Sequence, residues 1–159
     1  MPRVLVRNFS ISLDGFGAGP DQSLDAPIGL GGDQLHSWIF ETRFGRQMIG
    51  GEAGSVGRDN DFLEAGDRGV GATIMGRNMF DQASAAAGGG DVRIGGGVST
   101  IQQFLRAGLI DELGLAIVPI LLGRGERLFD SGKIGSPRYE CAEIACSSAV
   151  AHVRLRRLA

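Results

Sequence analysis

One segment of the sequence combines features that suit a ligand with phosphate groups. A strand-like run, Asp91–Ile94, leads through three glycines, Gly95–Gly97, into a helix-like run over 99–107. Glycines let the main chain approach a ligand, and a helix N-terminus offers free N–H groups and a positive dipole end. We therefore expect the turn to hold the phosphates of a nucleotide cofactor. The alternative is an ordinary tight turn, in which Ser99 and Gln102 form a capping box.

Two further strand ends could contribute to the same ligand site. Ala72–Met75 reads as a buried strand and is followed by Gly76 and Arg77, whose guanidinium could hold a phosphate as a fork. Asp14 and Gly15 follow the strand-like run 3–12, where a carboxylate could bind a substrate hydroxyl or move a proton. The alternatives are a surface arginine after a helix entry and a turn-forming Asp-Gly pair.

Other polar residues give weaker signals. His36, beside Trp38, could line a pocket or lie on the surface, and His152 is expected to be structural. The glycine turn is not a GxGxxG fingerprint, and no P-loop, Ser-His-Asp order or metal-ligand spacing is present. Cys141 and Cys146 lie five apart in a strand-like run, so alternation predicts opposite faces, a buried or half-buried location and no mutual disulfide.

Composition limits the classes of protein that the chain can represent. Its 159 residues suit one compact domain, and we expect a single domain over 1–159. The 16 Lys and Arg against 18 Asp and Glu give no electrostatic reason to expect nucleic acid or an anionic membrane as a partner. No apolar run approaches the length of a membrane span, no secretory signal is visible, and we expect a cytoplasmic location.

The elements that must position these residues alternate between strands and helices. A helix is expected over 34–48, capped by Asp33, with a stripe of Leu35, Ile39, Phe40 and Phe44 facing inward. A short helix is expected over 59–65, a scrap of helix at 81–90 and a helix with Ile101, Phe104 and Leu105 on one side. Strands are expected over 113–122, 138–145 and 149–158, with a loop over 123–129. The pattern indicates one α/β domain with a mixed sheet and an antiparallel C-terminal pair.

In this order, the motifs resemble the dihydrofolate-reductase-like family, and within it the reductase domain of the bifunctional riboflavin-biosynthesis deaminase-reductases. The matching pieces are Ser12-Leu13-Asp14-Gly15, Ile74-Met75-Gly76-Arg77, Ile94-Gly95-Gly96-Gly97 and Ile110-Asp111-Glu112-Leu113 continuing to Pro119-Ile120-Leu121-Leu122-Gly123-Arg124-Gly125. The last piece is the most specific, and it ends in Leu128-Phe129. The resemblance spans most of the chain, from 4 to 129.

The resemblance implies a three-layer α/β fold with a mixed, mostly parallel central sheet, and a homodimer. It also implies NADPH lying across the strand ends, and hydride transfer to a small-molecule substrate, a riboflavin-precursor-like ribosylaminouracil or a pterin-like heterocycle. Asp14, as the catalytic residue, would face the substrate together with Gly15 and His36. The cofactor-binding residues it implies are Gly76, Arg77, Ile94, Gly95, Gly96, Gly97, Val98, Ser99 and Thr100.

The sequence departs from the family in two places. Members usually have a longer stretch after the Met-Gly-Arg motif, and this chain is shorter there by roughly tens of residues, through either a true deletion or the absence of a mobile segment from the sequence. The expected first helix has Asp33 and Glu41 beside its apolar stripe but no clear match to the acid of folate reductases. The leading hypothesis is therefore an NADPH-dependent reductase. Alternatives are a non-catalytic nucleotide-binding protein on the same fold, dihydrofolate reduction, and last a nucleotide or phosphate-ester transferase.

Overall fold

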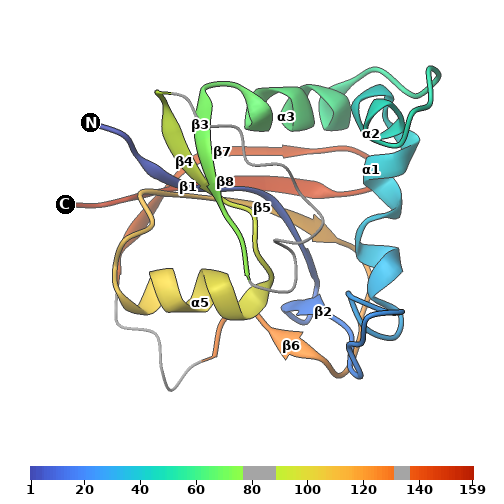
Figure 1. The fold of residues 1–159 in the computed structure, drawn as a ribbon, viewed down its shortest axis with the longest axis horizontal. Helices are drawn as coiled ribbons and strands as arrows, with labels where there is room; N and C mark the ends of the chain where they lie inside the picture. The colour runs from blue at the N-terminus through green and yellow to red at the C-terminus, as the bar shows by residue number, and fades with distance from the viewer. Residues whose placement is uncertain (77–88, 131–136) are drawn as a thin grey trace.

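A six-stranded mixed sheet forms the centre of the protein (Figure 1). The computed structural model describes residues 1–76, 89–130 and 137–159. The strand order is β3-β4-β1-β5-β8-β7, in which β3, β4, β1 and β5 are parallel neighbours and β8 and β7 run antiparallel. A separate two-stranded antiparallel sheet pairs β2 with β6. The predicted fold class, with its antiparallel C-terminal strand pair, is confirmed.

The strands are β1 (Val4–Ser12), β2 (Phe16–Ala18), β3 (Val70–Ile74), β4 (Asp91–Ile94), β5 (Glu112–Val118), β6 (Glu126–Arg127), β7 (Tyr139–Cys146) and β8 (Ala151–Arg157). The helices are η1 (Gly32–Leu35), α1 (Ser37–Glu41), α2 (Arg43–Met48), α3 (Arg58–Asp67) and α5 (Val98–Arg106). Among the described helices, none is both long enough and apolar enough to cross a membrane.

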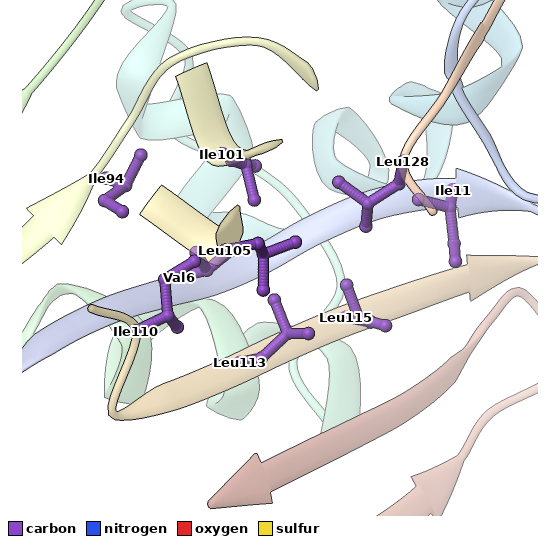
Figure 2. Packing of buried hydrophobic residues seen from close by; sticks show 9 residues of the cluster. All are labelled: Val6, Ile11, Ile94, Ile101, Leu105, Ile110, Leu113, Leu115 and Leu128. Atoms are coloured by element: carbon purple, nitrogen blue, oxygen red, sulfur yellow. The ribbon is translucent and has the colours of Figure 1, made fainter. Parts of the chain in front are cut away.

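Two apolar clusters cover opposite faces of the sheet. On one face α5 buries Ile101 and Leu105 against residues of β4, β1 and β5 (Figure 2). On the other face Leu35, Trp38 and Leu63, from η1, α1 and α3, pack against β5 and its surroundings. The inward side that we predicted for α5 is confirmed, because Ile101, Leu105 and Phe104 all belong to the first cluster.

A bulge in β1 keeps Val6, Phe9 and Ile11 on the α5 face. Val6 pairs with Leu113 and Phe9 with Leu115, so β1 takes three residues where β5 takes two. Asn8, within the bulge, has φ of 50° and its amide donates to the carbonyl of Phe62 in α3. Without the extra residue, strict alternation would turn every later side chain of β1 to the opposite face.

The helix that we predicted over 34–48 is wrong, because the chain forms three short helices there. Thr42 interrupts the run in an extended conformation and caps α2, its hydroxyl accepting from Gly45 N at 3.0 Å. Asp33 makes no capping bond, since η1 begins after Gly31 without a side-chain cap. Of the predicted stripe, Leu35 is buried, but Phe40 is exposed.

Thr42→Ala is expected to destabilise the protein by about 1 kcal/mol, the usual cost of removing an N-cap hydroxyl. The hydroxyl also donates to Ile39 O at 2.6 Å, so its loss removes a hydrogen bond from each of the two helices that meet at this residue. Urea denaturation of Thr42→Ala and Thr42→Ser would measure the effect. Serine keeps the hydroxyl and should retain most of the stability; equal losses in both variants would contradict the cap.

The expectations for the cysteines are wrong in two respects. Both Cys141 and Cys146 are exposed and free. Cys141 pairs with Leu155 and Cys146 with Ala151. Five steps along β7 therefore lie opposite four steps along β8, so β7 contains a bulge of its own. Because directly paired residues point to the same side, the two cysteines share one face of β7.

Other elements differ in extent from our predictions. β5 ends at Val118, before the predicted 122, and the predicted loop over 123–129 contains the short strand β6. The short helix predicted over 59–65 is confirmed as the longer α3. The scrap of helix predicted at 81–90 falls mainly outside the described residues.

Candidate cofactor-binding site

The carboxyl ends of β3, β4 and β1 meet at one edge of the sheet. The chain leaving β1 continues onto the face covered by α1 to α3, whereas the chain leaving β4 continues into α5 on the opposite face (Figure 1). Neighbouring parallel strands whose connections leave to opposite faces define a topological switch point, where ligands of open α/β sheets bind. The glycine turn, Gly95–Gly97, lies at this point.

The glycines of the turn pack closely around the first turn of α5. A Cβ atom on Gly96 would lie 2.7 Å from Thr100 Cβ, and one on Gly76 would lie 3.2 Å from Thr100 Oγ1. A Cβ on Gly97 would meet nothing within 4 Å. The turn is therefore tight on its inner side and open at Gly97, as a main chain that receives a ligand requires.

The start of α5 leaves its N-terminal groups uncapped by side chains. Gly97 is the N-cap residue and provides no side-chain bond. The capping box predicted from Ser99 and Gln102 is wrong, because Ser99 lies inside the helix and Gln102 Nε2 donates to Arg127 O at 2.7 Å. The first N–H groups of a helix have no partners within it and favour an anion.

A pocket of about 410 Å³ opens beside the start of α5. Its lining residues are Phe16, Val98, Ser99, Gln102, Gly125, Glu126, Arg127 and Asp130. The guanidinium of Arg127 lies 4.4 Å from the centre of the Phe16 ring and donates to the main-chain carbonyl of Asp14 at 3.0 Å. Sequence reasoning missed Arg127, because it occupies an unspecified position between Gly125 and Leu128 of the motif and the pairing of β6 with β2 is long-range.

Asp14 lies at the end of β1, where its carboxylate fastens two loops. Oδ1 accepts from Ser12 Oγ at 2.6 Å and from Leu122 N at 3.1 Å, and Oδ2 accepts from Gly123 N at 2.7 Å. These bonds, led by that of Ser12, lower the pKa of Asp14 from 3.8 to about 2. A carboxylate with this pKa stays ionised at neutral pH and is a poor proton donor.

The pKa of Asp14 predicts a specific dependence on pH. Since the folded pKa is depressed, its stabilising contribution is complete above the unfolded value and is lost as the pH falls from about 4 toward 2. A carboxyl carbon titration by NMR should place the midpoint near 2 in the wild type and higher in Ser12→Ala. An Asp14 midpoint near 3.8 in the wild type would contradict these hydrogen bonds.

The remaining predicted site residues lie in different surroundings. Gly15, adjoining Asp14, has φ of 87° and its carbonyl accepts from Leu128 N at 2.9 Å. His36 is half-buried between η1 and α1, with Nδ1 3.4 Å from Gly32 O, and burial lowers its pKa. The structure gives no contact between His36 and Asp14 that would make one site of them. Arg77 lies outside the described residues.

Charged residues elsewhere do not suggest a metal centre. Within 1–76, 89–130 and 137–159, no three His, Cys, Asp or Glu side chains form a group that could hold a metal ion. His152 is buried, its Nε2 2.8 Å from Asp59 Oδ1 and its ring stacked on Phe62. It therefore ties β8 to α3, as the structural role predicted for it requires.

Comparisons with known proteins agree with this fold. The family described as the RibD C-terminal domain matches residues 77–153. A structure of a protein named for riboflavin biosynthesis from Shewanella sp. PV-4 superposes with a TM-score of 0.62 at 20% identity, covering 100% of both chains. A search of curated protein sequences gives no significant match.

Two further solved structures are more distant. RibD of Acinetobacter baumannii has 18% identity and a TM-score of 0.38, with 98% of this chain and 37% of that chain covered. The riboflavin biosynthesis reductase Rib7 of Saccharomyces cerevisiae has 10% identity and a TM-score of 0.45, with 99% and 90% covered. The family match supports a reductase role, and the Shewanella structure supports the fold. The resemblance to the reductase domain of the riboflavin-biosynthesis deaminase-reductases, first seen in the motifs, is thus confirmed.

Proposed function

We propose that the protein is an NADPH-dependent reductase that transfers a hydride to a riboflavin-precursor-like ribosylaminouracil or a pterin-like heterocycle. The observation that carries this proposal is the glycine turn at the switch point, open at Gly97 and followed directly by the uncapped start of α5. The family match adds the reductase chemistry. The main chain and the helix dipole together suit a pyrophosphate.

The residues fit such a cofactor in the following way. Ile94 to Thr100 would hold the pyrophosphate and line the nicotinamide side, and Gly76 and Arg77 would lie toward the adenosine phosphate. The close packing of Gly76 and Gly96 on Thr100 supports their grouping in one site. When bound, the nicotinamide would supply the hydride, and the protein would contribute mainly positioning and electrostatics.

We propose a positioning role for Asp14 on the substrate side. Its carboxylate oxygens accept from Ser12, Leu122 and Gly123, so they hold the loop after β5 against the end of β1. Asp14 and Gly15 would border the substrate, and His36 would approach it from the helical face. An ionised Asp14 could accept a bond from a substrate hydroxyl, whereas proton donation would need another group or water.

The domain organisation, location and partners of the enzyme are part of the same proposal. We propose that residues 1–159 form one domain, that the enzyme acts in the cytoplasm on a small molecule as a homodimer, and that neither nucleic acid nor a membrane is a partner. The nearly balanced charge, 16 basic against 18 acidic residues, supports the last point.

The test has two stages. NADPH is titrated into the purified protein while its fluorescence is followed, with NADH as the comparison. NADPH oxidation is then measured with ribosylaminouracil and dihydropterin substrates. Binding with turnover is the expected result. Binding without turnover on any substrate would indicate a non-catalytic nucleotide-binding protein, and no binding of either dinucleotide would refute the reductase.

A further inference from the structure

Strand β6 and the residue after it connect α5 with the turn that follows β1. Leu128, directly after β6, is fully buried in the same apolar cluster as Ile101 of α5 (Figure 2). Gln102, also in α5, donates through Nε2 to the main-chain carbonyls of Arg127 at 2.7 Å and Leu128 at 3.4 Å. The main chain of β6 is therefore fixed to α5, the helix whose start forms the proposed pyrophosphate seat.

The same strand fixes the residues from Asp14 to Ala18, named here the Asp14–Ala18 segment. β6 pairs with β2 within this segment, and the amide of Leu128 donates to Gly15 O at 2.9 Å. The segment also packs directly on α5, because a Cβ on Gly17 would lie 2.6 Å from Val98 Cγ2. The segment therefore lies against the first residue of the helix on which the proposed cofactor would sit.

The side chain of Arg127 adds two contacts to the Asp14–Ala18 segment. Its Nη1 donates to Asp14 O at 3.0 Å, and its guanidinium lies 4.4 Å from the centre of the Phe16 ring. Phe16 is buried, whereas Arg127 is exposed. A guanidinium is attracted to the face of an aromatic ring, so Arg127 holds a main-chain carbonyl and a buried ring on either side of Gly15.

Asp14 is consequently held at two points. Its carboxylate accepts three hydrogen bonds, from Ser12, Leu122 and Gly123. These bonds fix the side chain, whereas the bond from Arg127 fixes the peptide unit that leads into Gly15. Gly15 has φ of 87°, a region open to glycine, so contacts on both sides of it are needed to define the course of the segment.

We propose that Arg127 is a positioning residue of the proposed reductase, which holds the Asp14–Ala18 segment against the start of α5. This inference rests on the proposed function, in which the segment borders the substrate and α5 receives the cofactor. Arg127 acts through Asp14 and Phe16 and not on a reacting atom. Hydride transfer needs its donor and acceptor about 3–3.5 Å apart, so a shift of the segment by about 1 Å lowers the rate strongly.

Two substitutions separate the contacts of Arg127 from its charge. Arg127→Met keeps an unbranched stem but removes the donor and the cation. Arg127→Lys keeps a cation and a donor, but an ammonium lacks the flat fork that serves the Asp14 carbonyl and the Phe16 ring together. Arg124→Met is the matched control and should behave as the wild type throughout. Arg124 is an exposed arginine of the same loop, and the structure gives its side chain no hydrogen bond to a described residue.

Hydrogen exchange of the free protein tests whether Arg127 holds the segment. The amide of Phe16 donates to Ser12 Oγ at 3.0 Å and that of Leu128 donates to Gly15 O, so both amides report on the segment. In Arg127→Met these amides should exchange about 10-fold faster, because one hydrogen bond and one cation–π contact are lost. In Arg127→Lys the exchange rates should lie between those of Arg127→Met and the wild type.

Steady-state kinetics test whether the position of the segment matters for turnover. In Arg127→Met, kcat for NADPH oxidation should fall about 10-fold, because the segment is no longer held in one arrangement. The Kd for NADPH should change by less than about three-fold, because the glycine turn and the main chain of α5 are unaltered. Arg127→Lys should recover part of kcat. A general loss of structure would instead weaken binding and turnover together.

The two measurements separate the possible failures. Equal exchange rates in Arg127→Met and the wild type would overturn the proposal, and so would an unchanged kcat in a variant whose segment exchanges faster. A loss of NADPH affinity as large as the loss of kcat would also overturn it, since Arg127 would then belong to the cofactor seat or serve the fold alone. A wild type that neither binds NADPH nor turns over would refute the reductase. The exchange rates need no cofactor, so they distinguish that failure from a failure of Arg127 to hold the segment.

Discussion

Gly97→Glu is expected to weaken NADPH binding by at least about 100-fold, or about 2.7 kcal/mol, without unfolding the protein. The added side chain enters open space, because a Cβ on Gly97 meets nothing within 4 Å. Its carboxylate would lie at the N-cap of α5, where the proposed site seats the pyrophosphate. The new charge competes for the helix N-terminus and repels the phosphates.

Gly97→Ala is the matched control, because it adds the Cβ without the charge. The affinity for NADPH, measured by fluorescence, should stay within a few-fold of the wild type in Gly97→Ala and fall strongly in Gly97→Glu. Equal melting temperatures of the two variants would show that both are folded. Gly96 is a less suitable position, since any Cβ there lies 2.7 Å from Thr100. Unchanged affinity in Gly97→Glu would show that the glycine turn is only a helix entry.

The sheet could be predicted from sequence because its strands depend on local patterns. β4 matches the predicted run at both ends, and α5 follows three glycines with its apolar side inward. The prediction of one helix over 34–48 failed because Thr42 adopts an extended conformation and caps the next helix with its hydroxyl, so that one helix ends there and another begins. The prediction that the two cysteines lie on opposite faces failed because a bulge changes the alternation of side chains along β7. The position of the bulge depends on the pairing with β8.

The candidate site could be predicted only in the part that is formed by main-chain groups. Glycines before a helix indicate a place where a ligand can approach the main chain, and this indication does not depend on distant residues. Gly76, Gly96 and Thr100 indeed lie together. Of the three hydrogen bonds to Asp14, the leading one comes from nearby Ser12, but those from Leu122 and Gly123 join residues more than a hundred positions apart and left no local signal. Arg127 was missed for the same reason.

The buried carboxylate of Glu112 connects three arginines at the amino-terminal end of the sheet. It contacts Arg7 directly, and it lies 3.6 Å from Arg3 and 3.8 Å from Arg154. The Glu112 side chain is 6% exposed and that of Arg7 15%. Burial lowers the pKa of Arg7, and the nearby positive charges of Arg154 and Arg3 lower it further.

Glu112→Gln is therefore expected to cost about 3–5 kcal/mol of unfolding free energy, because it leaves the largely buried guanidinium of Arg7 without its carboxylate partner. That loss is a large part of the 5–15 kcal/mol typical of a domain. In urea it corresponds to a midpoint lowered by about 1.5–2.5 M, for a slope near 2 kcal/mol/M.

Glu140→Gln provides the matched comparison, because Glu140 is 51% exposed and lies 3.7 Å from Arg156 in an exposed pair. Exposed pairs contribute about 0–1 kcal/mol, so this variant should denature close to the wild type. The double variant Arg7→Met with Glu112→Gln should recover part of the loss, since it removes a buried charge together with its partner. Equal midpoints for Glu112→Gln and Glu140→Gln would mean that water or neighbouring acids screen Arg7, and that burial of Glu112 contributes little to the stability of the sheet.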